Sequence, residues 1–385
     1  MLNITVYEKN SILESLKEVL DCLPIIFVLG IITGFGPYTT IVGGFIISFV
    51  FFVFGKKYSF IFAPTIVYAT VLASLNVSLG GRSETLFALL FVSSLITILI
   101  SILKIHRKTV LTVPKPVIQG FMTGCFLSAF ILSLPLIFGQ KTFSTLGLML
   151  SSKGHIFAQI NEISLVFACL TFAIYYYLKK FKIKFISPAF MAVIIAGVIN
   201  YFYNFNLENI YIGIKNFTPV ATADFGHFIR LLISGLILSL IMTTETLLNL
   251  RASKKTNNEI KSPKMPVFLV GLANLFASVT GSIAGVLAKK SENGKNRFLT
   301  VVEAVVLLLF VIFFEKISTF IPIASISAIL FITSYEAIKN AILAQRIKNV
   351  QSKIIFSICL ICSLCNIILG FMIAIVFALV MKTKK

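Results

Sequence analysis

The sequence predicts an all-α polytopic membrane protein with fourteen membrane-crossing segments. Two observations support this fold class. Apolar residues make up 58% of the 385 residues and charged residues only 12%, and the mean hydropathy is +0.99. A soluble domain has about 45–50% apolar and about 25% charged residues. The apolar residues also form long runs, and a membrane-spanning helix needs about 20 of them. A water-soluble domain is disfavoured and a disordered chain is excluded.

The first seven segments lie in residues 23–205, after a charged N-terminal segment at residues 1–22. The first run is short because charged residues precede it. The second begins after Pro37 and ends before Lys56 and Lys57, and the third contains Pro64. In chain order the runs are Leu23–Phe35, Tyr38–Phe54, Phe60–Leu75, Thr85–Leu103, Pro116–Phe138, Ile163–Leu178 and Pro188–Phe202.

Seven further segments lie in residues 226–381. Glu245 lies inside the first of them, and the third is short and is broken at Gly281 and Gly285. The last run is long enough for two helices, which we expect to turn near Asn366 and Gly370. In chain order the runs are Phe228–Leu250, Pro266–Thr280, Gly281–Lys289, Phe298–Phe314, Ile321–Ile338 and Ile354–Met381.

Two of the fourteen segments are short or broken, and they occupy the same place in each half. These are the third segment, around Pro64, and the tenth, around Gly281–Gly285. Interruptions at corresponding positions are typical of a transporter binding site. Free backbone N–H groups at a broken helix are tolerated where they line a cavity and meet an anionic ligand. The alternative interpretation is that both are ordinary kinks in membrane helices.

The charges are unbalanced, with 34 Lys and Arg against 14 Asp and Glu and a net charge of +20. If the N-terminus is cytoplasmic, 28 of the 34 basic residues fall in the segments that fourteen crossings place on the cytoplasmic side. This asymmetry predicts an integral protein of the plasma membrane or bacterial inner membrane with both termini cytoplasmic. The lysines would contact anionic lipid headgroups, so no nucleic-acid partner is needed to explain them.

Three charged residues lie in or beside apolar runs. Glu245 lies inside the eighth run, where an ionisable group is by default a functional hypothesis. It could bind Na⁺ together with a hydroxyl such as that of Thr244, could carry a proton, or could simply bond across helices. Glu303 follows Arg297 by six residues, and we expect it to reach the membrane interface. Lys289 could supply positive charge for an anion or could be the first cytoplasmic residue of its loop.

The sequence contains no Gly-rich phosphate loop, no His/Cys metal cluster and no nucleophile–base pair. Cys359, Cys362 and Cys365 have a metal-like spacing, but they lie inside an apolar run and we interpret them as packing residues. We therefore expect neither an enzyme nor a bound metal or cofactor.

Several motifs in order along the chain resemble the sulfate permease (SulP) family of anion transporters. The resemblance runs from about Pro24 to Met381. The motifs that carry it are Gly34-Phe35-Gly36-Pro37-Tyr38-Thr39, Ala63-Pro64-Thr65, Pro116-Val117-Ile118-Gln119-Gly120-Phe121, Glu245-Thr246-Leu247-Leu248, Gly271-Leu272-Ala273-Asn274 and Ile321-Pro322-Ile323-Ala324.

The resemblance implies two inverted repeats of seven helices, divided into a core and a gate domain, with half-helices at segments 3 and 10. It implies elevator-like alternating access, a possible homodimer, and a small anion such as sulfate, bicarbonate or chloride held between the half-helices. Glu245, with Thr244, would couple transport to H⁺ or Na⁺. The substrate-binding residues would be Pro64, Thr65 and Ile66 on one side and Ala284, Gly285, Val286 and Lys289 on the other.

The sequence also departs from the family pattern. The tenth segment is about two residues short, Ile25 stands where many members have Gln, and no STAS domain follows the last segment. Two alternatives therefore stay open. One is a nucleobase–cation symporter of the same architecture, whose usual tenth-segment acid could only be Glu292. The other is a degenerate paralogue that does not transport.

Overall fold

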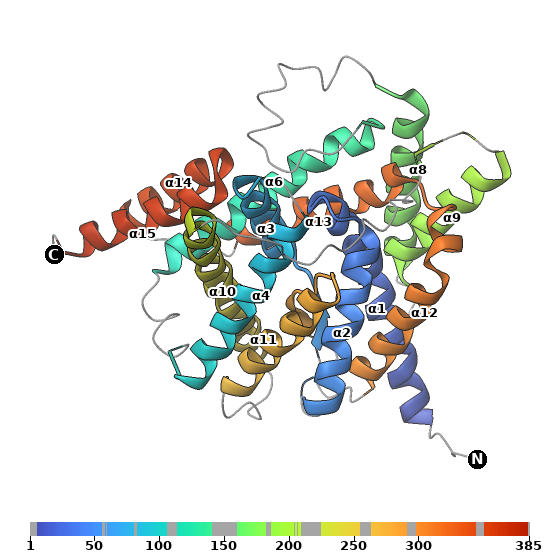
Figure 1. Ribbon diagram of the computed structural model, residues 1–385. Helices are drawn as coiled ribbons and strands as arrows, with labels where there is room; N and C mark the ends of the chain where they lie inside the picture. The colour runs from blue at the N-terminus through green and yellow to red at the C-terminus, as the bar shows by residue number, and fades with distance from the viewer. Residues whose placement is uncertain are drawn as a thin grey trace.

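The computed structural model describes residues 6–55, 58, 60–80, 83–105, 114–140, 160–181, 186–203, 205, 207–208, 225–254, 263–290, 298–343 and 350–383. Over these residues the chain forms thirteen α-helices and one two-stranded sheet (Figure 1).

The first half of the chain closely follows the predicted runs. The one large difference is at the start, where the first helix already begins at Val6, so most of the charged N-terminal segment is part of it. The elements are α1 (Val6–Ile32), α2 (Pro37–Phe54), β1 (Phe60–Ala63), α3 (Ile66–Ser78), α4 (Ser83–Ile102), α6 (Lys115–Ile137), α8 (Glu162–Phe181) and α9 (Pro188–Tyr203).

The second half contains the predicted turn in its last run. Asn366 lies between the two final helices, and its side-chain oxygen accepts from the backbone N–H groups of Ile368 (3.1 Å) and Leu369 (3.2 Å). It thus caps the second helix and ends the first. The elements are α10 (Phe225–Lys254), α11 (Lys264–Val279), β2 (Val286–Lys290), α12 (Leu299–Ser318), α13 (Ile323–Leu343), α14 (Val350–Cys365) and α15 (Ile367–Thr383).

The third segment is interrupted at Pro64, as predicted. The buried strand β1 ends at Ala63, and α3 begins at Ile66. Proline disfavours helix at the residue before it and lacks an N–H to donate. Thr65 then starts the helix, because its hydroxyl accepts from Tyr68 N–H at 3.1 Å in the usual N-cap geometry.

The prediction of a second half-helix is wrong for the tenth segment, Gly281–Lys289. Residues 282–285 have no regular structure, and Val286–Lys290 forms β2, which pairs antiparallel with β1. The Cα partners are Phe60↔Lys290, Ile61↔Lys289, Phe62↔Leu287 and Ala63↔Val286, with a register shift between Ile61 and Phe62. Pairing with β1 satisfies backbone groups that a membrane interior would otherwise leave unsatisfied, so an extended conformation is stable here.

The helices pack in two groups. In one group α2, α4, α10, α11 and α12 contact one another and the two strands. In the other, α6, α8, α9, α13, α14 and α15 contact one another. Helices α1 and α3 contact members of both groups, so they lie along the boundary (Figure 1).

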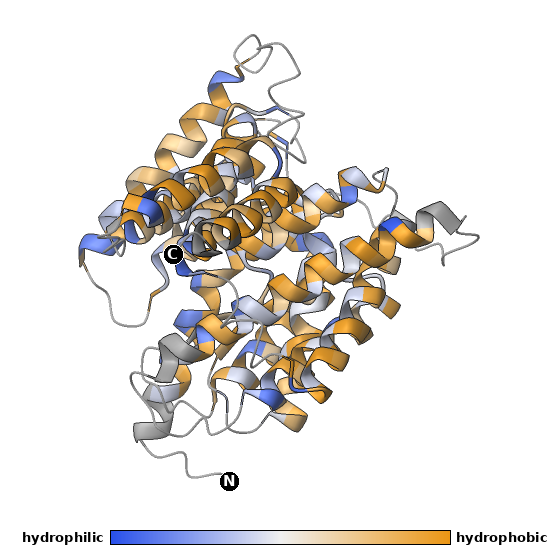
Figure 2. Ribbon diagram, turned by 90° about the vertical axis from the view of Figure 1, so that its left-hand side faces the viewer, coloured by the Kyte–Doolittle hydropathy of each residue, from blue (hydrophilic) through white to orange (hydrophobic). Residues whose placement is uncertain are grey.

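The outer surface of the described chain is strongly apolar. Five of its helices are long and apolar enough to cross a membrane: residues 37–54, 85–102, 115–137, 162–181 and 228–250. Large apolar side chains such as Val166, Val305 and Ile312 are more than half exposed. Hydrophobic residues dominate most of the helices in Figure 2. In water such a surface would drive aggregation, whereas lipid tails cover it without cost.

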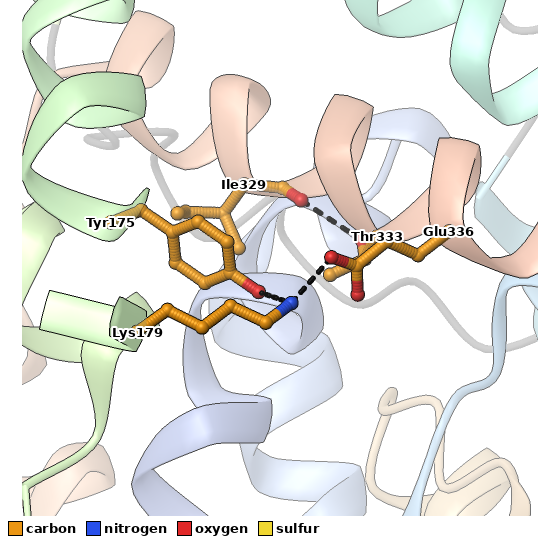
Figure 3. Close-up of polar contacts among 5 residues, drawn as sticks. All are labelled: Tyr175, Lys179, Ile329, Thr333 and Glu336. Carbon is orange, nitrogen blue, oxygen red and sulfur yellow. Dashed lines mark hydrogen bonds and ion pairs between the residues drawn. The ribbon is translucent and has the colours of Figure 1, made fainter. Parts of the chain in front are cut away.

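One ion pair joins two helices of the second group. Lys179 of α8 donates from Nζ to Glu336 Oε1 of α13 and to the Tyr175 hydroxyl at 3.0 Å (Figure 3). Both charged side chains are partly exposed, at 46% and 39%. Such pairs contribute about 0–1 kcal/mol, so this contact orients α8 against α13 more than it stabilises the fold.

Candidate functional site

The N-terminus of α3 lies inside the protein, where the chain changes from strand to helix. Ala63 and Tyr68, on either side of the change, are buried. Tyr68 N–H is occupied by the Thr65 hydroxyl, whereas the N–H groups of Ile66 and Val67 have no hydrogen-bond partner among the described residues. A helix N-terminus carries roughly half a positive charge. The first turn of α3 can therefore bind an anion through free N–H donors.

Glu245 of α10 lies directly beside this helix terminus. Both of its carboxylate oxygens are 2.8 Å from the Thr65 hydroxyl, which donates to them. The side chain is only 6% exposed. The structure thus joins Glu245 to Thr65 across 180 residues of sequence. An anionic ligand at the N-terminus of α3 would lie close to this carboxyl group.

The threonines around Glu245 are arranged differently from the sequence prediction. Thr244 is partly exposed and makes no hydrogen bond to Glu245 in the described part of the chain. The hydroxyls of Thr243 and Thr246 are buried and have no partner among the described residues. These two hydroxyls, rather than that of Thr244, are free to bind a ligand on the turn of α10 that carries Glu245.

Gly285 packs against the same change from strand to helix. Its φ is +91°, and a Cβ at this position would lie 2.3 Å from Pro64 N and 2.4 Å from the Ala63 carbonyl carbon. Only glycine fits both the backbone conformation and the space. The predicted positions Pro64 and Gly285 are therefore in direct backbone contact, and the buried Ala284 and Val286 flank this contact.

Asn274 of α11 holds Gly285 in place. Its Nδ2 donates to Gly285 O at 2.6 Å, and its Oδ1 accepts from Gly285 N–H at 3.2 Å. The same Oδ1 accepts from the Tyr68 hydroxyl at 3.2 Å. Asn274 is 1% exposed, so one amide joins α11, α3 and the backbone before β2. Sequence reasoning missed this role, although an amide inside an apolar run was a visible signal.

Two further predicted residues take defined positions. Lys289 lies in β2 with its backbone opposite Ile61, and its side chain is outside the described part of the chain. Glu303 does not reach the membrane interface, and that expectation is wrong. It is 1% exposed, and its Oε1 accepts from Phe62 N–H of β1 at 2.8 Å. Glu303 lies just inside α12, whose contact with β1 turns this side chain inward.

Comparison with protein families gives one match over most of the chain. The model described as the sulfate permease family matches residues 20–362. A bicarbonate transporter, BicA, of Picosynechococcus sp. is 25% identical over 408 residues, which cover 98% of this chain and 70% of that protein. A putative sulfate transporter, YvdB, of Bacillus subtilis is 24% identical, covering 92% of this chain and 69% of that protein.

Solved structures share the fold. The transmembrane domain of a cyanobacterial bicarbonate transporter BicA has a TM-score of 0.79 at 20% identity, covering 96% of this chain and 97% of that one. The murine anion transporter Slc26a9 in its inward-facing state has a TM-score of 0.79 at 14% identity, covering 99% and 69%. With the family model matching nearly the whole chain, the protein belongs to the sulfate permease family of membrane anion transporters.

Proposed function

We propose that this chain is a secondary transporter that moves a small anion of the sulfate, bicarbonate or chloride class across a membrane. The observation that carries the proposal is the inward-lying N-terminus of α3, with two free N–H groups beside Thr65. Membership of the sulfate permease family and relatives named as bicarbonate and sulfate transporters support the same substrate class.

In this proposal the anion accepts hydrogen bonds from Ile66 and Val67 N–H and contacts Pro64 and Thr65. Ala284, Gly285 and Val286 would form the adjoining wall, where Gly285 contacts the backbone of Pro64. One helix terminus thus provides the positive end of a dipole. Lys289, which lies in β2 three residues after Val286, supplies further positive charge to the same region.

Glu245 couples the anion to a cation. An ionised carboxylate about 5 Å from a bound anion would repel it by roughly 3 kcal/mol at an effective dielectric constant of about 20. That repulsion lowers affinity by about a hundredfold or more. Binding of H⁺ or Na⁺ at Glu245 removes this repulsion, and the hydroxyls of Thr243 and Thr246, which have no partner among the described residues, lie on the same turn of α10. The anion and the cation therefore bind together.

The division of the helices into two groups supports elevator-like alternating access. The group with the strands would act as the core domain and the other as the gate domain, within inverted repeats at residues 23–205 and 226–381. The core would move past the gate along α1 and α3. We further propose that both termini are cytoplasmic in a plasma or bacterial inner membrane, and that the protein forms a homodimer.

The proposal is tested with purified protein in liposomes. Uptake of sulfate, bicarbonate, chloride and dicarboxylates is measured with and without Na⁺ and with and without a pH gradient. Uptake of at least one anion, stimulated by one of the two cation gradients, is the expected result. Competition of uptake by uracil or xanthine would instead indicate a nucleobase–cation symporter.

One observation favours a second candidate, a paralogue that does not transport. Residues Gly281–Lys290 form no half-helix, and Gly285 touches Pro64, so the described residues leave no gap between two facing helix ends. If folded protein in liposomes carries none of the tested anions under any gradient, this candidate replaces the transporter.

A further inference from the structure

Glu303 of α12 is a second buried carboxyl near the strand-to-helix change, and the mechanism above does not use it. Its Oε1 accepts from Phe62 N–H at 2.8 Å, whereas its Oε2 is buried and has no hydrogen-bond partner among the described residues. We propose that Glu303 is a proton-binding site, separate from Glu245, and that it holds its proton in this conformation.

Among the side chains that the structure describes, none forms an ion pair with Glu303. Its one hydrogen-bond donor among the described residues is Phe62 N–H, and the hydroxyl of Ser48 on α2 is the polar side chain beside it. α2 and β1 contain no charged residue at all. A buried carboxylate without a counter-charge is expensive and is normally neutralised by a proton.

Charged residues near α12 also come from α1, which contacts it, and from β2, which pairs with β1. α1 contacts α12 and carries the acids Glu18 and Asp21, which as like charges cannot neutralise an ionised Glu303. β2 contributes Lys289 and Lys290, whose backbones lie opposite Ile61 and Phe60. The alternative to a bound proton is therefore an ion pair between a lysine of β2 and an ionised Glu303.

A proton fits this site better than a metal ion. Hard cations such as Ca²⁺ take about six to eight oxygen ligands, whereas the described residues provide one carboxyl and the Ser48 hydroxyl at this site. Ser48 already donates to Gly44 O at 2.7 Å. The described residues contain no group of three acids, histidines or cysteines that could hold a metal.

The location links this proton to the candidate site. Phe62 lies at the register shift of the sheet, where Glu303 supplies the acceptor for its N–H. Three residues later Thr65 is held by Glu245. Carboxyls from two helices therefore hold the two ends of the segment Phe62–Thr65. If the proposed transport function holds, the Glu303 proton contributes to the pH dependence of uptake. The proposal that Glu303 binds a proton does not itself require that the protein transports an anion.

Infrared spectroscopy of the purified protein tests the bound proton directly. A protonated carboxyl has a C=O stretch that is separate from the carboxylate bands. We expect this band at neutral pH in wild type and in the control E315Q, which changes an exposed acid on the same helix, and a loss of band intensity in E303Q. If E303Q has the same spectrum as wild type, Glu303 is ionised and the proposal is wrong.

Two further variants keep the test decisive. E18Q/E245Q removes the other two buried acids of the described chain. If the protonated-carboxyl band persists in this double variant, the proton is assigned to Glu303 even if E303Q misfolds. Loss of the band in the double variant overturns the proposal.

K289Q tests the alternative ion pair. A band that appears only in K289Q means that the lysine pairs with an ionised Glu303. Should no variant transport any anion, the infrared result still decides the proton site.

In liposomes that show uptake, E303Q mimics the protonated acid. We expect it to retain uptake with a weaker dependence on external pH than wild type, because one titrating group is removed. An unchanged pH profile, together with an infrared band assigned to Glu303, would restrict the proton to a structural role and refute its part in transport.

Discussion

Replacement of Gly285 by Ala tests the close contact at the centre of the candidate site. Two penalties add at this position. The left-handed backbone, with φ of +91°, costs a residue with a side chain about 1–2 kcal/mol. The new Cβ would also lie 2.3–2.4 Å from the backbone of Ala63 and Pro64, and such overpacking costs about 1–3 kcal/mol. We therefore expect a loss of about 2–5 kcal/mol in the free energy of unfolding.

Gly80 provides the matched control. Its φ is +93°, but a Cβ there would meet nothing within 4 Å. Gly80→Ala therefore pays only the backbone penalty of about 1–2 kcal/mol. The free energy of unfolding of both variants is measured by reversible unfolding in mixed micelles. The difference between the two losses gives the cost of the close contact at Gly285. Uptake should be lost in Gly285→Ala and kept in Gly80→Ala. Equal destabilisation of the two variants would refute the claim that Gly285 touches Pro64.

Three other changes test the neighbouring groups. Asn274→Leu leaves Gly285 N–H and C=O without partners, and at about 1–3 kcal/mol for each such group we expect a loss of 2–6 kcal/mol in unfolding experiments; a loss below 1 kcal/mol would contradict the amide's role. Thr65→Val removes the cap of α3, so it should lower the free energy of unfolding by about 1 kcal/mol and weaken anion uptake. Thr65→Ser and Thr70→Val should behave like wild type. Equal KM values for all three variants would count against the site. Glu245→Gln mimics a neutralised carboxyl, so uptake should continue with little response to H⁺ or Na⁺ gradients, while Glu315→Gln keeps the wild-type response; coupling that survives in Glu245→Gln would exclude it as the coupling residue.

The sequence was a reliable guide where local chemistry decides the backbone. Pro64 ends β1 and Thr65 caps α3 because both effects act within a few residues. Asn366 separates the last two helices for the same reason. The positions of the two interruptions, at Pro64 and before Gly285, were therefore predictable from residue types and spacing.

Long-range pairing was not predictable in the same way. Val286–Lys290 is a strand because β1, more than two hundred residues earlier, provides a partner, and a short apolar run has no periodicity that separates strand from helix. The inward direction of Glu303 was missed because distance along the chain from Arg297 indicates depth in the membrane but not which face of α12 a side chain occupies. Asn274 was missed because its partner is an irregular backbone segment.

The ladder between β1 and β2 restricts how the protein can change shape. Separating the strands would expose backbone N–H and C=O groups to an apolar interior, at several kcal/mol for each group. Pro64 and Gly285 therefore travel together as one rigid insert that ties the first half of the chain to the second. If an anion binds at α3 as proposed, opening a gap between the two halves at this point would not release it. In the proposed movement of core past gate, the anion would instead leave past the surfaces of α1 and α3.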